Sequence, residues 1–283
     1  MFDRREKNIK IFQDTEHMYH TNEDLIAIVG NSIRNQKLVL EDDSVPVNAD
    51  ISKIGKVVVS GKRTLEASEL YAKQGKKVCV LNFASATNPG GGVVYGSSAQ
   101  EESICRCSTL YPCLDLDDMW DKFYIPHREA DDPLYNNDCI YTPDVMVFKS
   151  DTNFPEMLQK SEWWNVDVIT CAAPNLRSIP SNMMNSNAGS SQAKITHDGL
   201  KVLLMSRVKR IFELAIANGV EVLILGAFGC GAFRNPPKLV AEVFANYTKE
   251  YRNAFDAIEY AVFYVEHERA NYDAFREEMS QFI

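Results

Sequence analysis

The sequence predicts an α/β fold in which helices pack against a largely parallel central sheet. Short apolar runs typical of buried strands, such as Val78–Phe83 and 220–225, recur along the chain. Segments with the helical period lie between these runs, and residues 193–218 form the clearest of them. Because parallel strands need crossover connections, this alternation favours parallel pairing within one sheet.

The elements follow one another along a single predicted domain, 1–283, that begins with a helical extension over residues 1 to about 50. Thr21 is expected to be the N-cap of a helix over 22–36, and Gly75 to end a helix over 64–74. Residues 175–191, rich in Asn, Ser and Pro, are expected to form a long loop. The remaining strands are expected at 56–60, 141–149, 166–171 and 258–265, and the remaining helices at 98–110, 236–251 and 270–282.

Composition narrows the class of protein. The 283 residues carry a net charge of −9, with 45% hydrophobic and 24% charged residues. No basic tract offers the positive face that direct nucleic-acid binding needs, and no apolar run approaches the ~20 residues of a membrane span. The charged N-terminus has no signal-peptide core, and seven cysteines without a CxxC pair fit a reduced, cytoplasmic protein. A zinc site built on Cys105 and Cys107 is disfavoured, and no metal or cofactor is expected.

The most informative segment is 82–106, in which three glycines follow the apolar run Val78–Phe83. Gly90, Gly91 and Gly92 are followed, after seven residues, by Gln100, Glu101 and Glu102. A strand that ends in a glycine loop and then opens a helix can hold phosphate, because backbone N–H groups approach the ligand closely there. The two carboxylates just beyond indicate acid–base chemistry, although two glutamates can also be a solvated first helical turn.

A second segment, 225–237, repeats this order of strand, glycine loop and helix. Gly226, Gly229 and Gly231 form the loop, Asn235 is expected to cap the next helix, and Pro236 suits its first position. A single loop of this kind is usually a simple turn. Two such loops at the carboxyl edge of one sheet could clamp a diphosphate from both sides. The GxxxxGK[ST] phosphate loop does not occur, and GxGxxG is absent from its usual context near the N-terminus, which weighs against a nucleotide triphosphatase and a dehydrogenase.

At this point the residues resemble a known family. GGG, seven residues and QEE resemble the signature of poly(ADP-ribose) glycohydrolases, and the surrounding residues are similar to the microbial, bacterial-type branch. The resemblance implies a macrodomain-like three-layer sandwich with a mixed central sheet that binds ADP-ribose. It is carried by NFASATNPGGG (82–92), QEESICR (100–106), VDVITCAAPNL (166–176), GCGAF (229–233), AVFYV (261–265) and the N-terminal helices.

The resemblance also implies roles for individual residues. Glu102 falls on the catalytic acid, Glu101 on the glutamate that orients the ribose, and Asn88 on a ribose contact. Phe263 is the candidate for stacking on adenine. The other expected ADP-ribose contacts are Gly90, Gly91, Gly92, Val93, Gln100, Gly229, Cys230, Gly231, Ala232 and Phe233, and Gln100 is also expected to hold the start of its helix.

Cleavage of a ribose–ribose glycosidic bond passes through an oxocarbenium-like state. Adjacent residues on a helix project about 100° apart, so Glu101 and Glu102 cannot flank the bond as paired carboxylates. One glutamate acting first as acid and then as base fits better, provided that its pKa is raised. The predicted function is hydrolysis of poly(ADP-ribose), with the polymer or ADP-ribosylated proteins as substrate. A mono-ADP-ribosyl hydrolase and a non-catalytic ADP-ribose-binding module are the alternatives.

Overall fold

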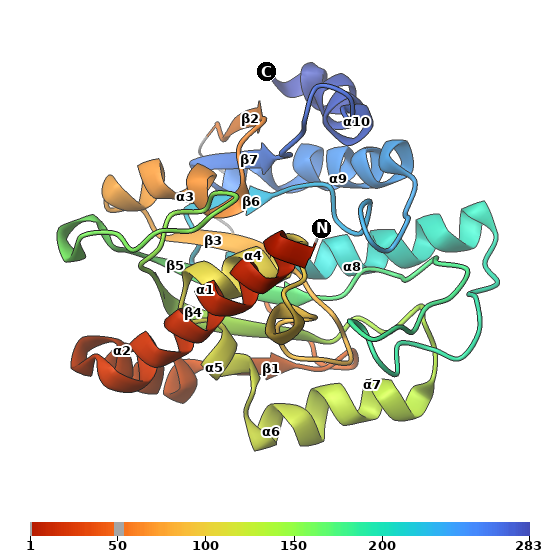
Figure 1. Cartoon of the computed structure of the whole chain (residues 1–283). Coiled ribbons are helices and arrows are strands. Elements are labelled where there is room, and N and C mark those ends of the chain that lie inside the picture. Colours follow the sequence, from red (N-terminus) through yellow and green to blue (C-terminus); the bar gives the residue numbers. More distant parts are fainter. Residues whose placement is uncertain (1, 48–53) are drawn as a thin grey trace.

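The computed structural model describes residues 2–47 and 54–283, and its centre is a mixed sheet (Figure 1). Within the described residues the strand order is β1-β4-β5-β3-β6-β7-β2. β5, β3, β6, β7 and β2 run parallel, and β4 is antiparallel to both of its neighbours. The strands are β1 (Lys37–Val39), β2 (Lys56–Ser60), β3 (Val78–Phe83), β4 (Cys139–Val147), β5 (Trp164–Cys171), β6 (Val222–Leu225) and β7 (Ala257–Ala261).

Both faces of the sheet are covered by helices, which makes three layers. Cys79 and Leu81 of β3 contribute to one core, and Val78 and Val80 to the other, because successive side chains of a strand point to opposite faces. This double burial explains why β3 is a continuous apolar run rather than an alternating one. The first face packs against α8 (His197–Ala217), α9 (Pro237–Tyr251) and α10 (Ala270–Met279), and the second against α1 (Phe2–Thr21), α3 (Thr64–Lys73) and α4 (Gln100–Cys107).

Short helical segments fill the connections. Residues 115–138, which show no clear period in the sequence, contain a π-helical turn between two short α-helices. The segments are α2 (Glu23–Asn35), η1 (Val93–Tyr95), α5 (Tyr111–Leu114), α6 (Asp117–Met119), η2 (Trp120–Tyr124), α7 (Ile125–Ala130), η3 (Lys160–Glu162), η4 (Arg252–Ala254) and η5 (Ser280–Phe282).

Two predicted helix caps are wrong. The N-cap of α2 is Asn22, whose side chain accepts hydrogen bonds from the backbone of Asp24 and Leu25. Thr21 instead ends α1, where its hydroxyl donates to the His17 carbonyl. At α9, Pro236 occupies the N-cap and the helix begins one residue later than expected. At α2 two neighbouring residues have similar capping chemistry, and at α9 two successive prolines, Pro236 and Pro237, both suit a helix start, so sequence alone places each boundary only to within a residue or two.

The N-terminal segment is tied closely to the rest of the molecule. The Asn8 amide donates to the Gly96 carbonyl over 3.0 Å, and the Thr15 hydroxyl donates to the Arg106 carbonyl over 2.6 Å. The buried Lys149 ammonium pairs with Asp14 at 2.7 Å. Helix α1 therefore holds both the segment after the three glycines and the end of α4. The expected single domain with a helical extension stays a prediction, and residues 1 and 48–50 of that extension lie outside the described residues.

Strand β1 was not expected within this extension, and it pairs with β4 at one edge of the sheet. No helix formed by residues 2–47 and 54–283 is long and apolar enough to cross a membrane.

Candidate active site

The first glycine loop connects β3 to α4 and packs against two carboxylates. Gly90 and Gly91 adopt left-handed backbone conformations with φ of +64° and +59°. A Cβ on Gly91 would stand 2.7 Å from Glu102 Oε1 and 3.0 Å from Glu101 Oε2. Glycine is therefore required at position 91 by both conformation and space, and the loop backbone lies directly on the glutamate pair.

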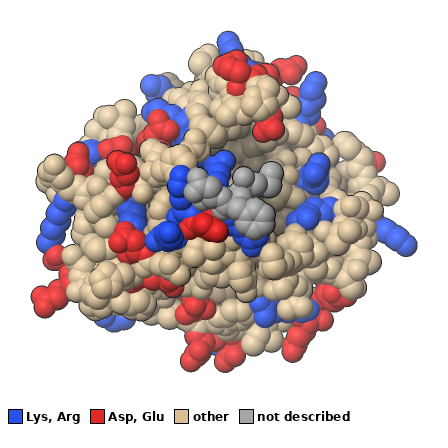
Figure 2. Space-filling model, in the orientation of Figure 1, with Lys and Arg blue, Asp and Glu red and all other residues tan. Residues whose placement is uncertain are grey.

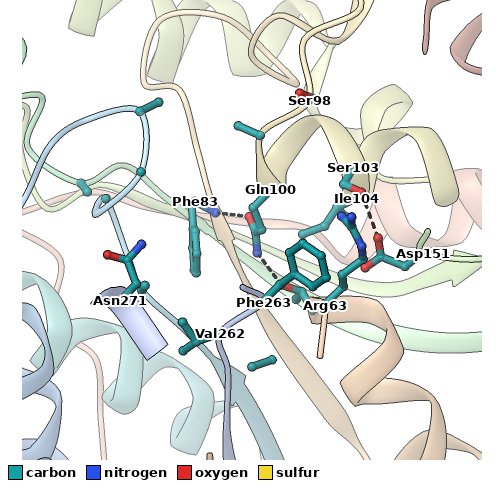
Figure 3. A pocket seen from close by; sticks show the side chains of 18 of the residues that line it. Arg63, Phe83, Ser98, Gln100, Ser103, Ile104, Asp151, Val262, Phe263 and Asn271 are labelled. Atoms are coloured by element: carbon teal, nitrogen blue, oxygen red, sulfur yellow. Dashed lines mark hydrogen bonds between the residues drawn. The ribbon is translucent and has the colours of Figure 1, made fainter. Parts of the chain in front are cut away.

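Gln100 fixes the start of α4 on the sheet. Its Oε1 accepts from the Phe83 N–H over 2.8 Å (Figure 3), and its Nε2 donates to the Leu81 carbonyl over 2.7 Å and to Thr64 Oγ1 over 3.0 Å. The N-cap residue, Ala99, offers no side-chain cap of its own. The Gln100 amide therefore holds the two following glutamates in place, as the sequence leads one to expect.

Glu101 is 3% exposed and is held by the end of β3. The Ser85 N–H donates to its Oε2 over 2.7 Å, and the Asn82 amide donates to its Oε1 over 3.2 Å. Burial, together with the charge of Glu102, raises the pKa of the Glu101 carboxyl well above its ordinary value. Its hydrogen bonds orient the carboxyl rigidly beside its neighbour.

Glu102 is 7% exposed, and its two oxygens have different surroundings. The Gly92 N–H donates to Oε1 over 2.9 Å, whereas the buried Oε2 has no hydrogen-bond partner among the described residues. Burial raises the pKa of the Glu102 carboxyl, and the Gly92 N–H and the Arg106 charge offset part of this rise. The two oxygens of this carboxyl therefore differ, since one accepts a backbone hydrogen bond and the other has no partner among the described residues.

The second glycine loop, between β6 and α9, is held at its base by hydrogen bonds. Asn235 does not cap α9, because its buried amide donates to the Pro174 carbonyl over 2.7 Å and to the Gly229 carbonyl over 3.1 Å. The Leu176 N–H donates to the Phe233 carbonyl over 2.9 Å. Gly229 has φ of +72°, while a Cβ on Gly231 would meet nothing within 4 Å. The loop is therefore fixed at its base and open at its tip.

A cavity of about 280 Å³, the main cavity, lies between the two loops. Figure 2 shows a hollow on this face of the molecule, with Lys and Arg side chains on both sides of it. Phe263, which is 48% exposed, lies against the Arg63 guanidinium with 4.1 Å between that group and the ring centroid (Figure 3). Phe263 lines the main cavity, and its stacking on adenine stays a prediction. Other lining residues are Lys62, Phe83, Ser98, Ala99, Gln100, Asp151, Gly229, Gly231, Ala232, Phe233 and Asn271.

A second cavity of about 240 Å³, the glutamate cavity, is lined by Glu101, Glu102 and Gly91. Its other walls come from the loop over 175–191, through Arg177, Asn182, Met184 and Asn185. The two cavities share Phe83, Ser98, Ala99, Ala232 and Phe233. They therefore adjoin, with the tip of the second glycine loop at their boundary.

Five of the predicted ADP-ribose contacts line neither cavity: Asn88, Gly90, Gly92, Val93 and Cys230. The Asn88 side chain bonds to Thr87, Arg128 and Ser186. Val93 is fully buried, and Cys230 packs against the core, where burial raises its thiol pKa to about 12. The structure thus gives these side chains structural partners, whereas Gly92 acts through its N–H on Glu102.

The sequence did not single out the loop over 175–191 as part of the site. Its Asn185 accepts from the Ser85 hydroxyl over 2.8 Å, which ties this loop to the first glycine loop beside Glu101. Phe83, which lines both cavities, was expected only as a strand residue. Composition indicated a loop, and nothing in a single sequence indicates which distant segment such a loop will contact.

No group of three or more His, Cys, Asp or Glu side chains that could hold a metal ion occurs among residues 2–47 and 54–283. The glutamates of the site have backbone and amide partners instead. The expectation of a reaction without metal or cofactor stays a prediction.

Comparison with known proteins identifies the family. Residues 6–150 match the model of the catalytic domain of microbial-type poly(ADP-ribose) glycohydrolase (PARG). The chain is 28% identical to the Thermomonospora curvata PARG structure, with a TM-score of 0.80 over 97% of this chain and 100% of that one. The same enzyme bound to the inhibitor ADP-HPD matches with 28% identity and a TM-score of 0.78, over 96% and 99% of the two chains.

Deinococcus radiodurans PARG in complex with ADP-ribose is 27% identical, with a TM-score of 0.75 over 89% of this chain and 97% of that one. No curated protein sequence matches the chain. The expected macrodomain-like α/β fold is confirmed by these structures. The chain belongs to the microbial-type poly(ADP-ribose) glycohydrolase family.

Proposed function

We propose that Glu102 is the acid–base residue with which this chain hydrolyses the ribose–ribose O-glycosidic bonds of poly(ADP-ribose). The observation that carries this role is the unequal state of its carboxyl. Oε1 is fixed by the Gly92 N–H, and Oε2 is buried, has no hydrogen-bond partner among the described residues and belongs to a residue that lines the glutamate cavity. A general acid needs such a free oxygen within reach of the bond that it protonates.

The two adjoining cavities fit the two parts of ADP-ribose. We place the adenine against Phe263 in the main cavity, the diphosphate between the two glycine loops, and the distal ribose in the glutamate cavity. The open space beside Gly231 leaves room for phosphate oxygens close to backbone. Similar structures with bound ADP-ribose and ADP-HPD support this class of ligand.

In the proposed mechanism the Glu102 carboxyl acts first in its protonated form and then in its ionised form. Protonated Glu102 donates its proton to the leaving ribose oxygen as the glycosidic bond breaks, and positive charge develops on the distal ribose. The substrate's own diphosphate offsets that charge. The Glu102 carboxylate then takes a proton from the attacking water, which restores the acid. Burial prepares the first step, because it raises the pKa of Glu102 and favours the protonated form.

Glu101 has a positioning role in this scheme. The Ser85 N–H and the Asn82 amide hold its carboxyl in one orientation against the wall of the glutamate cavity. We place it against the hydroxyls of the distal ribose, where it fixes the sugar relative to Glu102. Its raised pKa has the same origin, burial, with the Glu102 charge as the second cause.

The cellular setting follows from the cysteines. All seven are free thiols, and all but Cys230 are buried. Free cysteines fit a reducing compartment, and we place the enzyme in the cytoplasm, acting on ADP-ribosylated proteins that carry the polymer. Direct nucleic-acid binding is not part of this function.

A substrate panel tests the proposal. Labelled poly(ADP-ribose) and a mono-ADP-ribosylated protein are incubated separately with the enzyme, with and without EDTA. We expect release of ADP-ribose from the polymer, at an unchanged rate in EDTA. Release from the mono-ADP-ribosylated protein alone would indicate a mono-ADP-ribosyl hydrolase, and binding without release a reader module. Loss of activity in EDTA that Mg²⁺ or Zn²⁺ restores would contradict the metal-free mechanism.

A further inference from the structure

A third cavity adjoins the glutamate cavity and carries two arginines. It has a volume of about 430 Å³ and is lined by Leu176, Arg177, Ser178, Ile179 and Arg234. We call it the arginine cavity. Among the described residues, neither guanidinium has a hydrogen-bond or ion-pair partner. The lining of this cavity contains two arginines and no carboxylate, so its local charge is positive on a chain with a net charge of −9.

The arginine cavity is connected to the site of cleavage through Arg177. This residue lines both the arginine cavity and the glutamate cavity that contains Glu101 and Glu102. Arg234 follows Phe233, the last residue of the second glycine loop to line the main cavity. An anion held by both arginines therefore lies next to the catalytic end of the cleft, beyond the place of the distal ribose.

The backbone holds both arginines in position. The Leu176 N–H donates to the Phe233 carbonyl over 2.9 Å, which joins the two segments that carry them. Arg234 is in the left-handed region with φ of +64°, a conformation with a steric cost for a residue that has a Cβ. Its N–H donates to the Gly231 carbonyl over 3.2 Å, which fixes this turn. Strain of this kind is typical of functional positions.

We propose that the arginine cavity binds the diphosphate of the ADP-ribose unit on the leaving side of the cleaved bond, and so makes the enzyme selective for polymer. This subsite rests on the proposed function, in which the distal ribose occupies the glutamate cavity. The leaving group in the polymer is the adenosine ribose of the next unit, and a diphosphate is attached to that ribose. Two planar guanidinium groups suit a diphosphate because each can donate two parallel hydrogen bonds.

The test compares two substrates that share the reacting ADP-ribose and differ in the leaving group. One is poly(ADP-ribose), and the other is an ADP-ribose glycoside of an uncharged phenol. Arg234→Ala is expected to lower kcat/KM for the polymer about tenfold or more, the loss typical of a hydrogen bond to a charged group. The same variant is expected to hydrolyse the phenol glycoside at the wild-type rate, because that leaving group carries no phosphate.

Two further variants sharpen the result. Arg234→Lys keeps the charge and loses the paired donors, so an intermediate loss on the polymer is expected. Lys249→Ala removes one positive charge from an exposed position on α9 and is expected to change neither rate. The polymer kcat/KM of Arg234→Ala is also expected to fall less steeply with salt than that of the wild type.

The outcomes separate the subsite from the proposed function. Wild-type rates of Arg234→Ala on both substrates would overturn the subsite and leave the role of Glu102 intact. Equal losses on both substrates would also overturn it, because they would place Arg234 at the reaction centre. If the wild-type enzyme cleaved neither substrate, the proposed function itself would be wrong.

Discussion

Both glycine loops lie between a strand and a helix, but their glycines are needed for different physical reasons. In the first loop, a side chain at Gly91 would meet the carboxyls of Glu101 and Glu102, so the protein itself requires glycine there. In the second, a Cβ on Gly231 would meet nothing within 4 Å. Gly231 has no positive φ and no close neighbour, so the fold does not explain this glycine, and we attribute it to the ligand. The second loop is therefore the better reporter of the ligand.

The loops also differ in what they hold. The first loop contacts the reacting groups, because the Gly92 N–H donates to Glu102. The second loop is tied at its base by Asn235, and it lines the main cavity with Gly229, Gly231, Ala232 and Phe233. Substitutions in or beside the first loop should therefore affect chemistry and folding, and substitutions at the tip of the second should affect binding alone.

The largest expected effect is on the rate of hydrolysis after substitution of Glu102, the residue that the first loop contacts. Glu102→Gln keeps an oxygen for the Gly92 N–H but cannot supply or take up a proton. We expect hydrolysis of poly(ADP-ribose) to fall roughly 10²–10⁴-fold, the usual loss for a general acid–base, while the affinity for ADP-ribose stays close to wild type. Rates of ADP-ribose release and calorimetric titration with ADP-ribose measure the two quantities. Near-wild-type turnover would remove Glu102 from the mechanism.

The matched pair Gly91→Val and Gly231→Val tests the comparison directly. Gly231→Val is expected to weaken ADP-ribose binding about tenfold or more, or about 1.4 kcal/mol, because the side chain fills space meant for phosphate. Its free energy of unfolding should stay within about 0.5 kcal/mol of wild type. Gly91→Val is expected to lose both binding and stability, since the left-handed conformation alone costs about 1–2 kcal/mol.

Calorimetry with ADP-ribose and urea unfolding of both variants separate the two cases. Unchanged affinity of a folded Gly231→Val variant would contradict the placement of the diphosphate between the loops. A Gly91→Val variant as stable as wild type would contradict the steric account of the first loop.

A smaller effect is expected at the asparagines that anchor each loop. Asn235 donates to two carbonyls, those of Pro174 and Gly229, whereas Asn8 donates to one, that of Gly96. Asn235→Ala is expected to lower the free energy of unfolding by about 1–3 kcal/mol, and Asn8→Ala by less, because fewer buried acceptors lose their donor. Urea unfolding measures both. Asn235→Asp is the matched control, since it keeps the shape and directs a carboxyl oxygen at two carbonyl oxygens. A stable Asp variant would show that the amide donors do not matter.

The positions of both glycine loops could be predicted from the sequence, because the patterns that indicate them are local. The apolar run Val78–Phe83, the glycines after it and the helix that follows identify the first loop without knowledge of the fold. The same pattern identifies the second loop. Such a prediction is possible because a strand, a turn and a helix each show a pattern within a few residues.

The missed features are those that depend on distant contacts. Asn235 stands where a helix cap is expected, yet its amide bonds to Pro174, sixty-one residues away in sequence. Arg177 and Asn185 lie in a loop with no period, and only the folded chain brings them to Glu101 and Glu102. Strand β1 has only three residues, and it is a strand because it pairs with β4, not because its own sequence shows a strand pattern. Local chemistry therefore predicts the two loops, and tertiary contacts decide what surrounds them.

The smallest expected effect is a pH-dependent difference in stability between the wild type and Glu102→Gln. Burial raises the pKa of Glu102 in the folded state above the value of about 4.3 expected for an unfolded chain. For such a group, the favourable contribution to folding is present below the unfolded pKa and is lost as pH rises through the folded pKa. Glutamine does not titrate, so the melting temperature of Glu102→Gln relative to wild type should rise between pH 4.5 and 8.

Glu101 adds to this difference with the same sign, because removal of the Glu102 charge also eases ionisation of its neighbour. Each unit of pKa shift corresponds to about 1.4 kcal/mol, which is a few degrees at most in a chain of this size. Calorimetric scans of both proteins across this pH range measure the difference. A difference that stays constant or falls with pH would mean that Glu102 ionises as readily in the fold as in water. Glu102 would then lack the proton that the first step of the reaction requires. The placement of the diphosphate at the tip of the second loop does not depend on this result.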